Sequence, residues 1–407
     1  MLASCGGGCW SKERCLNDKE SRDIKLSVRL DTDIPYGNAA DVEITEEEGR
    51  PVVSFAADPH GGPVCMWFCF RLSKIGDILQ GKTIKVVMKH FTNILGGHTD
   101  AALVPVIKYD GRDWDRLPPG IIEELPDGRH RQYWEIDAPD SFADIALCYP
   151  YGRPEIDVLL RETGGYWKAD TIGVSQSGRG LVRLSNRAGN RGDTCSGVFI
   201  IARQHSGEVP GSWVLDGLLR RMALADDSAP LTWVIPLADI DGVEQGDYGK
   251  DKFPWDLNRG WSAPGVPSMR HEAHAYEIDM HRWVERCRPL LALDLHAPGA
   301  RESEGVYAFM PQPRAFPEHY SLSATWADRF ASALGTKYAK SEFKRVANYR
   351  SRWDSPGFGS FCRQKLNLSV QSLEIPYGMI NDLVLTREHY REIGRILAEV
   401  ILENQVK

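Results

Sequence analysis

Three polar segments of this sequence each follow or end an apolar run, and they carry the side chains that bind and use metal ions. His205 and Glu208 follow the run GVFIIA, His296 ends LLALDLH, and Glu374 ends SVQSLE. Continuous apolar runs of this length are typical of strands buried on both faces of a parallel sheet. Because ligands bind beyond the carboxyl ends of such strands, we expect the four side chains to meet at one edge of the sheet.

Two histidines and one carboxylate suit a catalytic zinc ion, which takes three protein ligands and keeps a fourth position for water. His205, Glu208 and His296 form such a set. Bound zinc lowers the pKa of its water to about 7, which supplies hydroxide at neutral pH. Glu374 is then the expected general base, taking the proton of the water and returning it to the leaving group. The sequence thus predicts one zinc ion per chain and hydrolytic chemistry.

Each of these residues, taken alone, also has a structural explanation. A histidine at a strand end is more often a hydrogen-bonded structural residue, and His-x-x-Glu is common by chance. The second strand-end histidine is what favours metal binding. A competing cluster, His274, Glu277 and His281 on one predicted helix, lacks the zincin His-Glu-x-x-His pattern and is interpreted as a solvated helix face.

Asn258 and Arg259 lie in the polar segment FPWDLNRGW. A planar guanidinium fork beside an amide is a good pair for binding a carboxylate. A single loop arginine is usually only a surface charge, but next to a hydrolytic site the pair predicts a substrate with a free carboxylate.

Composition limits the classes of protein to which the chain can belong. Its 407 residues include 49 basic and 56 acidic side chains, giving a net charge of −7, which argues against a nucleic-acid-binding surface. No apolar run approaches the roughly 20 residues that span a bilayer. Nine cysteines without paired CxxC motifs favour reduced thiols in the cytoplasm. The start MLASC resembles a lipoprotein processing site with nothing before it that could insert, so a truncated lipoprotein signal is the minor alternative.

The residue pattern divides the chain into a flexible terminus (1–20), a β-rich domain (21–150) and an α/β domain (151–407). In the first of these domains, short apolar or alternating runs separated by turn clusters predict an antiparallel β-sandwich. Its expected strands are 24–30, 64–72, 83–88, 133–136 and 145–149. In the α/β domain, alternating strands and helices predict a largely parallel sheet. Its expected strands are 197–202, 232–237, 290–295 and 370–374, and its helices are 210–223, 269–287 and one that begins after Thr386.

The segment ARQHSGEVPGSWVLDGLL resembles the zinc-binding segment of the zinc metallocarboxypeptidases (funnelins), specifically their cytosolic carboxypeptidase-like branch in its bacterial type. The pieces IPLADIDGVEQGDYG, DLNRGW, LDLHA and SLEIPYG follow in the order of that family. MWFCFRL and IALCYPYGRPEID are similar to parts of the β-sandwich that precedes the catalytic domain in this branch. The similarity covers roughly residues 25 to 400, and the ordered set is far more specific than any single motif.

The resemblance implies zinc held by His205, Glu208 and His296, with Glu374 as the base. Asn258 and Arg259 match the pair that binds the terminal carboxylate of the substrate in this family. The implied reaction is hydrolysis of a C-terminal amide bond in a peptide. The implied catalytic fold is an α/β/α sandwich with a mixed, largely parallel central sheet.

The sequence departs from this family at one functional position. Family members carry an arginine after Gly-Asn-Tyr, where it polarises the scissile carbonyl, whereas this chain reads GDYGK at 246–250. Lys250 or Lys252 is expected to supply the positive charge instead, with Lys250 favoured. Because lysine is a point charge that cannot form a bidentate fork, the substrate class is less certain.

The capping tyrosine of the family has one candidate here, Tyr349. It lies in a basic stretch whose charges could favour acidic substrates, although a solvated surface run is the more common explanation. The basic residues of this stretch are Lys344, Arg345, Arg350 and Arg352.

Three functions are compatible with these residues. The first is a zinc carboxypeptidase acting on peptides. The second is a zinc amidase acting on cell-wall peptides or N-acyl amino acids. The third is an inactive scaffold whose β-sandwich binds a partner, which the retention of all four metal-site residues makes the least favoured.

Overall fold

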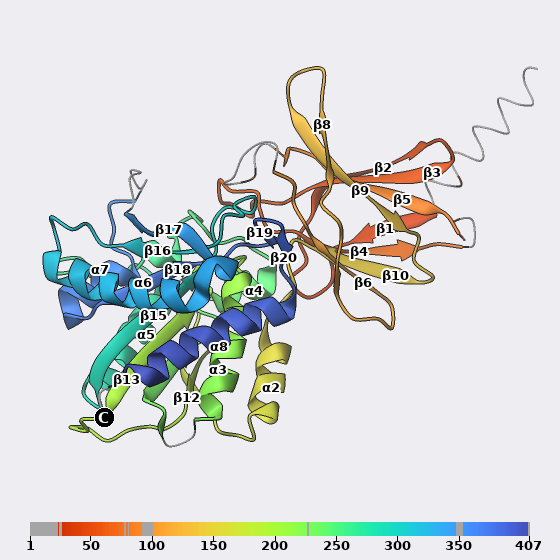
Figure 1. The fold of residues 1–407 in the computed structure, drawn as a ribbon. Coiled ribbons are helices and arrows are strands. Elements are labelled where there is room, and N and C mark those ends of the chain that lie inside the picture. Colours follow the sequence, from red (N-terminus) through yellow and green to blue (C-terminus); the bar gives the residue numbers. More distant parts are fainter. Residues whose placement is uncertain are drawn as a thin grey trace, which may run out of the picture.

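The structure of the protein is a computed structural model that describes residues 23, 27–76, 79, 81–91, 94, 101–225, 228–346 and 353–405. The predicted flexible terminus at 1–20 and the predicted capping residue Tyr349 lie outside these described residues. In Figure 1, a strand-only part at one end of the molecule adjoins a larger part in which helices surround a sheet.

Residues 28–146 form two five-stranded sheets that face each other. One has the order β1 (Val28–Asp31), β4 (Cys69–Lys74), β10 (Phe142–Ala146), β6 (Val106–Tyr109) and β7 (Asp115–Arg116). The other has the order β2 (Ala40–Glu47), β3 (Arg50–Ala56), β5 (Thr83–Met88), β9 (His130–Asp137) and β8 (Ile121–Glu124). Phe55 of β3 meets Phe70 of β4 edge to face with ring centroids 4.6 Å apart, so aromatic side chains from both sheets fill the core.

Most of the predicted sandwich is confirmed, with three corrections. β3 and β5 pair in parallel, because the chain crosses to the other sheet as β4 between them, so the sandwich is not wholly antiparallel. The predicted strand 64–72 begins only at Cys69, and the predicted strand 145–149 ends at Ala146. Where the apolar runs extend beyond the ladders, Met66–Phe68 and Leu147–Tyr149 are buried although they lie outside the strands, and Val64 and Cys65 are half-buried.

The second part is built on an eight-stranded mixed sheet. Its order is β11 (Lys168–Val174), β12 (Gly180–Ser185), β14 (Leu231–Ile235), β13 (Ser196–Ala202), β15 (Arg288–His296), β18 (Val370–Glu374), β16 (Val306–Met310) and β17 (Ala339–Val346). The four central strands run parallel, while β11, β12 and β16 introduce antiparallel pairings. A separate hairpin pairs β19 (Met379–Ile380) with β20 (Leu383–Val384).

The register of the central strands brings their carboxyl ends level with one another. Ala202 at the end of β13 pairs with Leu295, and His296 at the end of β15 pairs with Glu374 at the end of β18. The polar residues that follow these strands therefore emerge at one edge of the sheet.

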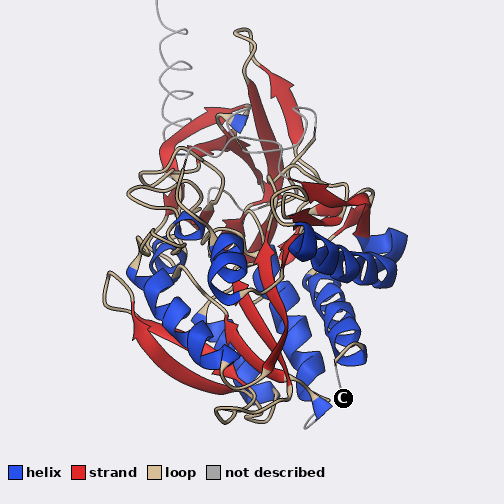
Figure 2. Cartoon of the chain, turned by 90° about the vertical axis from the view of Figure 1, so that its left-hand side faces the viewer, coloured by secondary structure: helices blue, strands red, loops and turns tan. Residues whose placement is uncertain are grey.

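Helices lie on both sides of this sheet (Figure 2). They are α2 (Arg153–Glu162), α3 (Pro210–Ala223), α4 (Ile240–Gln245), α5 (His271–Val284), α6 (Pro317–Tyr338), α7 (Phe358–Leu366) and α8 (Arg387–Glu403), with a 3-10 turn η3 at Leu257–Arg259. The predicted start of α8 is confirmed, because the Thr386 hydroxyl caps it by accepting from the backbone N–H of His389. None of the helices in the described ranges has the length and apolarity that a membrane crossing requires.

The sandwich is joined to the second part by buried polar contacts. The Arg116 guanidinium of β7 donates to the carbonyl oxygens of Leu385 and Tyr377 and to the Tyr390 hydroxyl. The side-chain amide of Asn38 donates to the carbonyl oxygen of Gly246 at 2.8 Å. We keep the division of the chain near residue 150, between β10 and α2, as a proposal.

Helices α3 and α8 cross closely because each has a glycine at the contact. A Cβ at Gly394 would lie 1.9 Å from the carbonyl oxygen of Val214, and one at Gly217 would lie 2.1 Å from that of Arg391. We expect Gly394→Ala to lower the free energy of unfolding by about 1–3 kcal/mol through overpacking, although alanine is the better helix former. Urea or thermal unfolding measures this loss. Gly359→Ala on α7 is the control, since its Cβ would meet only the mobile end of Arg363, at 3.1 Å. Equal stability of Gly394→Ala and Gly359→Ala would contradict the interpretation.

Candidate metal centre

His205, Glu208 and His296 come together at the edge of the sheet, as predicted. His205 and Glu208 lie in the loop between β13 and α3, and His296 is the last residue of β15. One ligand atom of each lies within 4.8 Å of the others, and all three residues are buried. Nδ1 of His205 is 2.8 Å from one Glu208 oxygen, and Nδ1 of His296 is 2.7 Å from the other. Both imidazoles thus turn the same nitrogen toward one carboxylate, a donor set that fits a divalent cation.

The opposite nitrogen of each imidazole faces an aspartate that sequence reasoning missed. Nε2 of His205 is 3.3 Å from Asp256, and Nε2 of His296 is 3.0 Å from Asp294. Carboxylates in this position fix the orientation of a ligand histidine and raise its basicity. One signal was available, because Asp294 precedes His296 by two residues on one strand, so both side chains share a face. The signal for Asp256 was only its place in the DLNR segment.

Charge pairing governs the ionisation of this group. Burial lowers the pKa of His296, but the charges of Asp294 and Glu208 outweigh it and hold that pKa well above its ordinary value. The pKa of His205 is raised in the same way, by Glu208 and Asp256 against burial. Burial raises the pKa of Glu208, yet the two histidines hold it well below its usual range. The buried carboxylate and the two imidazoles therefore favour each other's charged forms.

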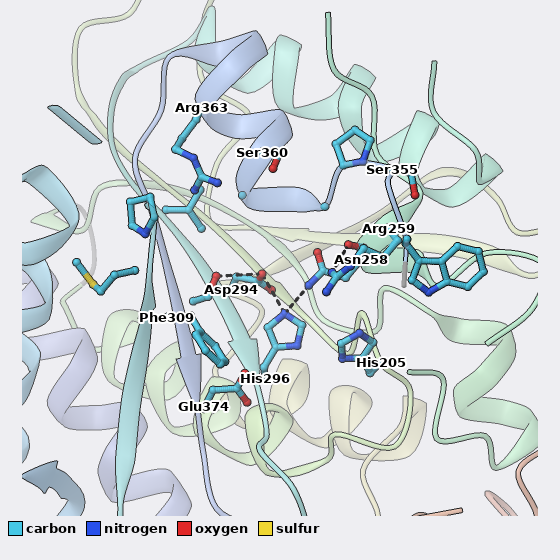
Figure 3. Close-up of a pocket in the computed structure, with 18 of the residues that line it drawn as sticks. His205, Asn258, Arg259, Asp294, His296, Phe309, Ser355, Ser360, Arg363 and Glu374 are labelled. Atoms are coloured by element: carbon cyan, nitrogen blue, oxygen red, sulfur yellow. Dashed lines mark hydrogen bonds and ion pairs between the residues drawn. The ribbon is translucent and has the colours of Figure 1, made fainter. Parts of the chain in front are cut away.

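Glu374 lies in the same pocket (Figure 3), at the end of β18. Its pKa is raised to about 7, chiefly by burial and then by the charge of Glu208, while His296 and Lys250 oppose the shift. Its Oε2 atom is buried and has no hydrogen-bond partner among the described residues. A carboxyl group with a pKa near the working pH suits general acid–base chemistry.

The residues expected to bind substrate line this pocket as well. It has a volume of about 340 Å³, and its walls include Lys250, Asn258 and Arg259 as well as His205, His296 and Glu374. The side-chain oxygen of Asn258 accepts a hydrogen bond from the backbone N–H of Phe358, which fixes the orientation of the amide. The structure therefore places the predicted carboxylate-binding pair beside the metal group, while the roles of these residues stay predictions. Figure 3 also labels Arg363 and Ser360 in the pocket wall, neither of which the sequence singled out.

The local backbone explains why glycine replaces the arginine that the family resemblance implied. Gly249 has φ +89°, and a Cβ there would lie 2.6 Å from the Ser206 hydroxyl and 2.7 Å from the Ser206 nitrogen. Position 249 thus lies directly against the segment that carries His205, and a side chain cannot be accommodated. Lys250 is the next residue and reaches the pocket, whereas Lys252, the other predicted cation, pairs with Asp247.

The competing helical cluster is a solvated face, as predicted, at His274 and His281, but not at Glu277. Glu277 is buried and accepts hydrogen bonds from the backbone N–H and the hydroxyl of Ser262. His274 and His281 are exposed. In the described part of the chain, the only group found with a metal-binding arrangement is that of His205, Glu208 and His296.

The chain was compared with family models, with curated proteins and with solved structures, and the proteins that match include carboxypeptidases. No family model matches the chain. It is 26% identical over 367 residues to cytosolic carboxypeptidase 6 of Mus musculus, an alignment covering 83% of this chain and 66% of that protein. With the Homo sapiens cytosolic carboxypeptidase 6, the identity is 25% over 377 residues, which covers 83% of this chain and 71% of the human protein. The chain thus spans about two thirds of the length of these curated relatives.

Solved structures share the fold over nearly the whole chain. A metallo-carboxypeptidase from Burkholderia cenocepacia matches with a TM-score of 0.72 at 17% identity, covering 93% of this chain and 98% of that one. A metallo-carboxypeptidase from Pseudomonas aeruginosa, in complex with (2-guanidinoethylmercapto)succinic acid, matches with a TM-score of 0.68 at 19% identity. That second match covers 92% of this chain and 98% of the other.

The ionisation of His205, Glu208 and His296 predicts that the protein releases protons when a cation binds to them. A metal ion needs neutral imidazoles, whereas the charges of Glu208, Asp256 and Asp294 raise the pKa values of His205 and His296 and so favour protonated rings before a metal ion binds. We therefore expect protons to be released when a divalent cation binds, in a number that rises as the pH falls. Calorimetric titration of the metal-free protein in two buffers of different ionisation enthalpy measures the number. A binding heat independent of the buffer would show that the imidazoles are neutral before the metal arrives, and His274→Ala should leave the number unchanged.

Proposed function

We propose that this chain, which belongs to the metallocarboxypeptidases and has the cytosolic carboxypeptidases among its homologues, is a zinc enzyme that hydrolyses C-terminal peptide bonds. The observation that carries the proposal is the placement of a His-Glu-His group, a buried glutamate and an Asn-Arg pair in one pocket. The His-Glu-His group suits binding of a metal ion, and the buried glutamate suits proton transfer. The Asn-Arg pair suits binding of a terminal carboxylate. We extend the cytosolic location in the relatives' names to this chain as part of the same proposal.

His205, Glu208 and His296 would hold the zinc ion, with Asp256 and Asp294 orienting the two imidazoles. The ion would supply the positive charge that polarises a carbonyl group and lowers the pKa of water. Three protein ligands leave a coordination position open, as catalytic rather than structural zinc sites require.

The other residues of the pocket have separate tasks. The Arg259 guanidinium and the Asn258 amide bind the terminal carboxylate of the substrate, which fixes the last peptide bond in place. Glu374 accepts a proton from the attacking water and transfers it to the departing amine. Lys250 faces the carbonyl oxygen as negative charge develops there. The succinic acid derivative bound by the Pseudomonas aeruginosa protein agrees with a site for carboxylate ligands.

The proton-transfer role of Glu374 predicts the behaviour of the amide variant. Glu374→Gln keeps the size of the side chain but cannot accept the proton, so we expect turnover to fall roughly 10²–10⁴-fold. Metal content, measured by elemental analysis of the purified protein, should stay near that of the wild type, because Glu374 is not one of the three ligands. Glu342→Gln, at an exposed position of β17, is the matched control with full activity. Undiminished turnover in Glu374→Gln would refute the assignment.

Carboxylate recognition is tested by Arg259→Lys. The variant keeps the charge but loses the two-pronged hydrogen bond, so KM for peptides with a free C-terminus should rise roughly tenfold to hundredfold. We expect kcat to change little and the exposed Arg191→Lys to behave as the wild type.

The choice of substrates tests the proposed function itself. Peptides with a free C-terminus should be cleaved, and the same peptides with an amidated C-terminus should not be. Turnover restricted to cell-wall peptides or N-acyl amino acids would replace the carboxypeptidase by an amidase. If metal-free protein bound no zinc when zinc was added, and cleaved none of these compounds in its presence, both functions would be excluded.

A further inference from the structure

Asp247 is a buried carboxylate that connects the sandwich to the active-site loop. Only 2% of its side chain is exposed, and a buried charge of this kind needs a partner. Nδ1 of His60 lies 2.6 Å from one of its oxygens, and the Lys252 ammonium pairs with the other. His60 belongs to the loop between β3 and β4 of the sandwich, whereas Asp247 lies three residues before Lys250.

A ring of hydrogen bonds reinforces this contact. The side-chain amide of Asn38 donates to the carbonyl oxygen of Gly246 at 2.8 Å, and its oxygen accepts from the backbone N–H of Asp58 at 2.8 Å. The Asp58 carboxylate in turn accepts from the backbone N–H of His60 at 2.9 Å. Two adjacent residues, Gly246 and Asp247, are therefore held by two connected loops of the sandwich, Gly246 by Asn38 of the β1–β2 loop and Asp247 by His60 of the β3–β4 loop. This double attachment restricts both the position and the direction of the segment that follows.

The other side of the segment lies against the metal group. The carbonyl oxygen of Tyr248 accepts from the backbone N–H of Gly207 at 2.9 Å, and its hydroxyl lies 3.4 Å from Glu208. Gly249 lies in contact distance of Ser206. Residues 246–252 contain neither helix nor strand beyond the end of α4, so these contacts and those of the sandwich hold the segment in place. Lys250 extends from it into the pocket.

We propose that His60 is a positioning residue for catalysis: through Asp247 it fixes the segment from which Lys250 reaches the scissile carbonyl. The inference rests on the role given to Lys250 in the proposed function. Lysine is a point charge on a flexible stem, so its contribution to the transition state depends on where its backbone is held. In this molecule, part of that support comes from the sandwich, which thereby becomes part of the catalytic apparatus.

The variant His60→Gly tests the proposal. His60 has φ +44°, a conformation that glycine adopts without strain, so the substitution removes the ring and little else. Asp247 keeps Lys252 as its partner. We expect kcat to fall about tenfold or more, because misplacement of a catalytic group by an ångström costs up to a hundredfold. KM for peptides with a free C-terminus and the zinc content should both stay near the wild-type values.

Two further variants separate positioning from mere stability. His60→Asn keeps a donor near the place of Nδ1 and tolerates a positive φ, so it should recover most of kcat. His90→Gly is the matched control, because His90 is a sandwich histidine at φ +54° that pairs with Asp41, which also belongs to the sandwich. It should keep the wild-type kcat.

A double-mutant cycle decides whether His60 acts through Lys250. If it does, His60→Gly should have no further effect on kcat in the Lys250→Ala background. The proposal would be overturned if the losses of kcat from His60→Gly and Lys250→Ala multiplied in the double variant. It would also be overturned if His60→Gly lost its zinc, or if His60→Asn lost as much kcat as His60→Gly. A wild-type protein without activity on free C-terminal peptides would instead count against the proposed function, on which the inference rests.

Discussion

The site depends on one buried carboxylate, that of Glu208, held between two imidazole rings. A charge removed from water in this way is tolerated only where opposite charge surrounds it, and here that charge comes from the imidazolium forms of His205 and His296 or from a metal ion. Each imidazole is in turn held from behind by an aspartate. Acidic and basic side chains thus alternate outward from Glu208, and a cation bound between them would displace protons from the imidazoles.

The sheet makes this arrangement possible through its register. β13, β15 and β18 are neighbours in space although more than 160 residues separate the first from the last along the chain, and their ends are level. A shift of one residue in β15 would turn His296 to the other face. Helix α3 packs against β13 and β15, and α8 packs closely on α3 because both helices have a glycine at their contact. Gly217 and Gly394 therefore help to support the two strands that lead to the site.

The fold and the metal group were largely predictable, because both leave strong local signals. Continuous apolar runs identified the central strands, and the strand-end histidines followed from them. The long helix α6 and strands β16 and β17 were not predicted. The apolar residues of α6 and β17 are more dispersed, and Gly335 interrupts the end of α6 with φ +58°. β16 has the continuous apolar run VYAFM, so this physical reason does not apply to it. The contribution of His60 was equally inaccessible, because the sequence gives no sign that a sandwich loop lies against a segment 187 residues away. Asp256 likewise needed the three-dimensional structure, whereas Asp294 could have been inferred from its place two residues before His296 on the same strand.

The close approach of Gly249 to Ser206 has a consequence for the selectivity of inhibitors. Where the related family presents a planar guanidinium, this pocket presents an ammonium that starts one residue, about 3.8 Å, further along the chain. At this position a compound whose acidic group is shaped for a two-pronged contact meets a single point charge, although Arg259 and Arg363 also line the pocket. Because the backbone leaves no room for a side chain at position 249, exchanging the residue does not convert one type of pocket into the other. Under the proposed function, compounds that bind both types would draw their affinity from the metal ion and from the Asn258 and Arg259 pair.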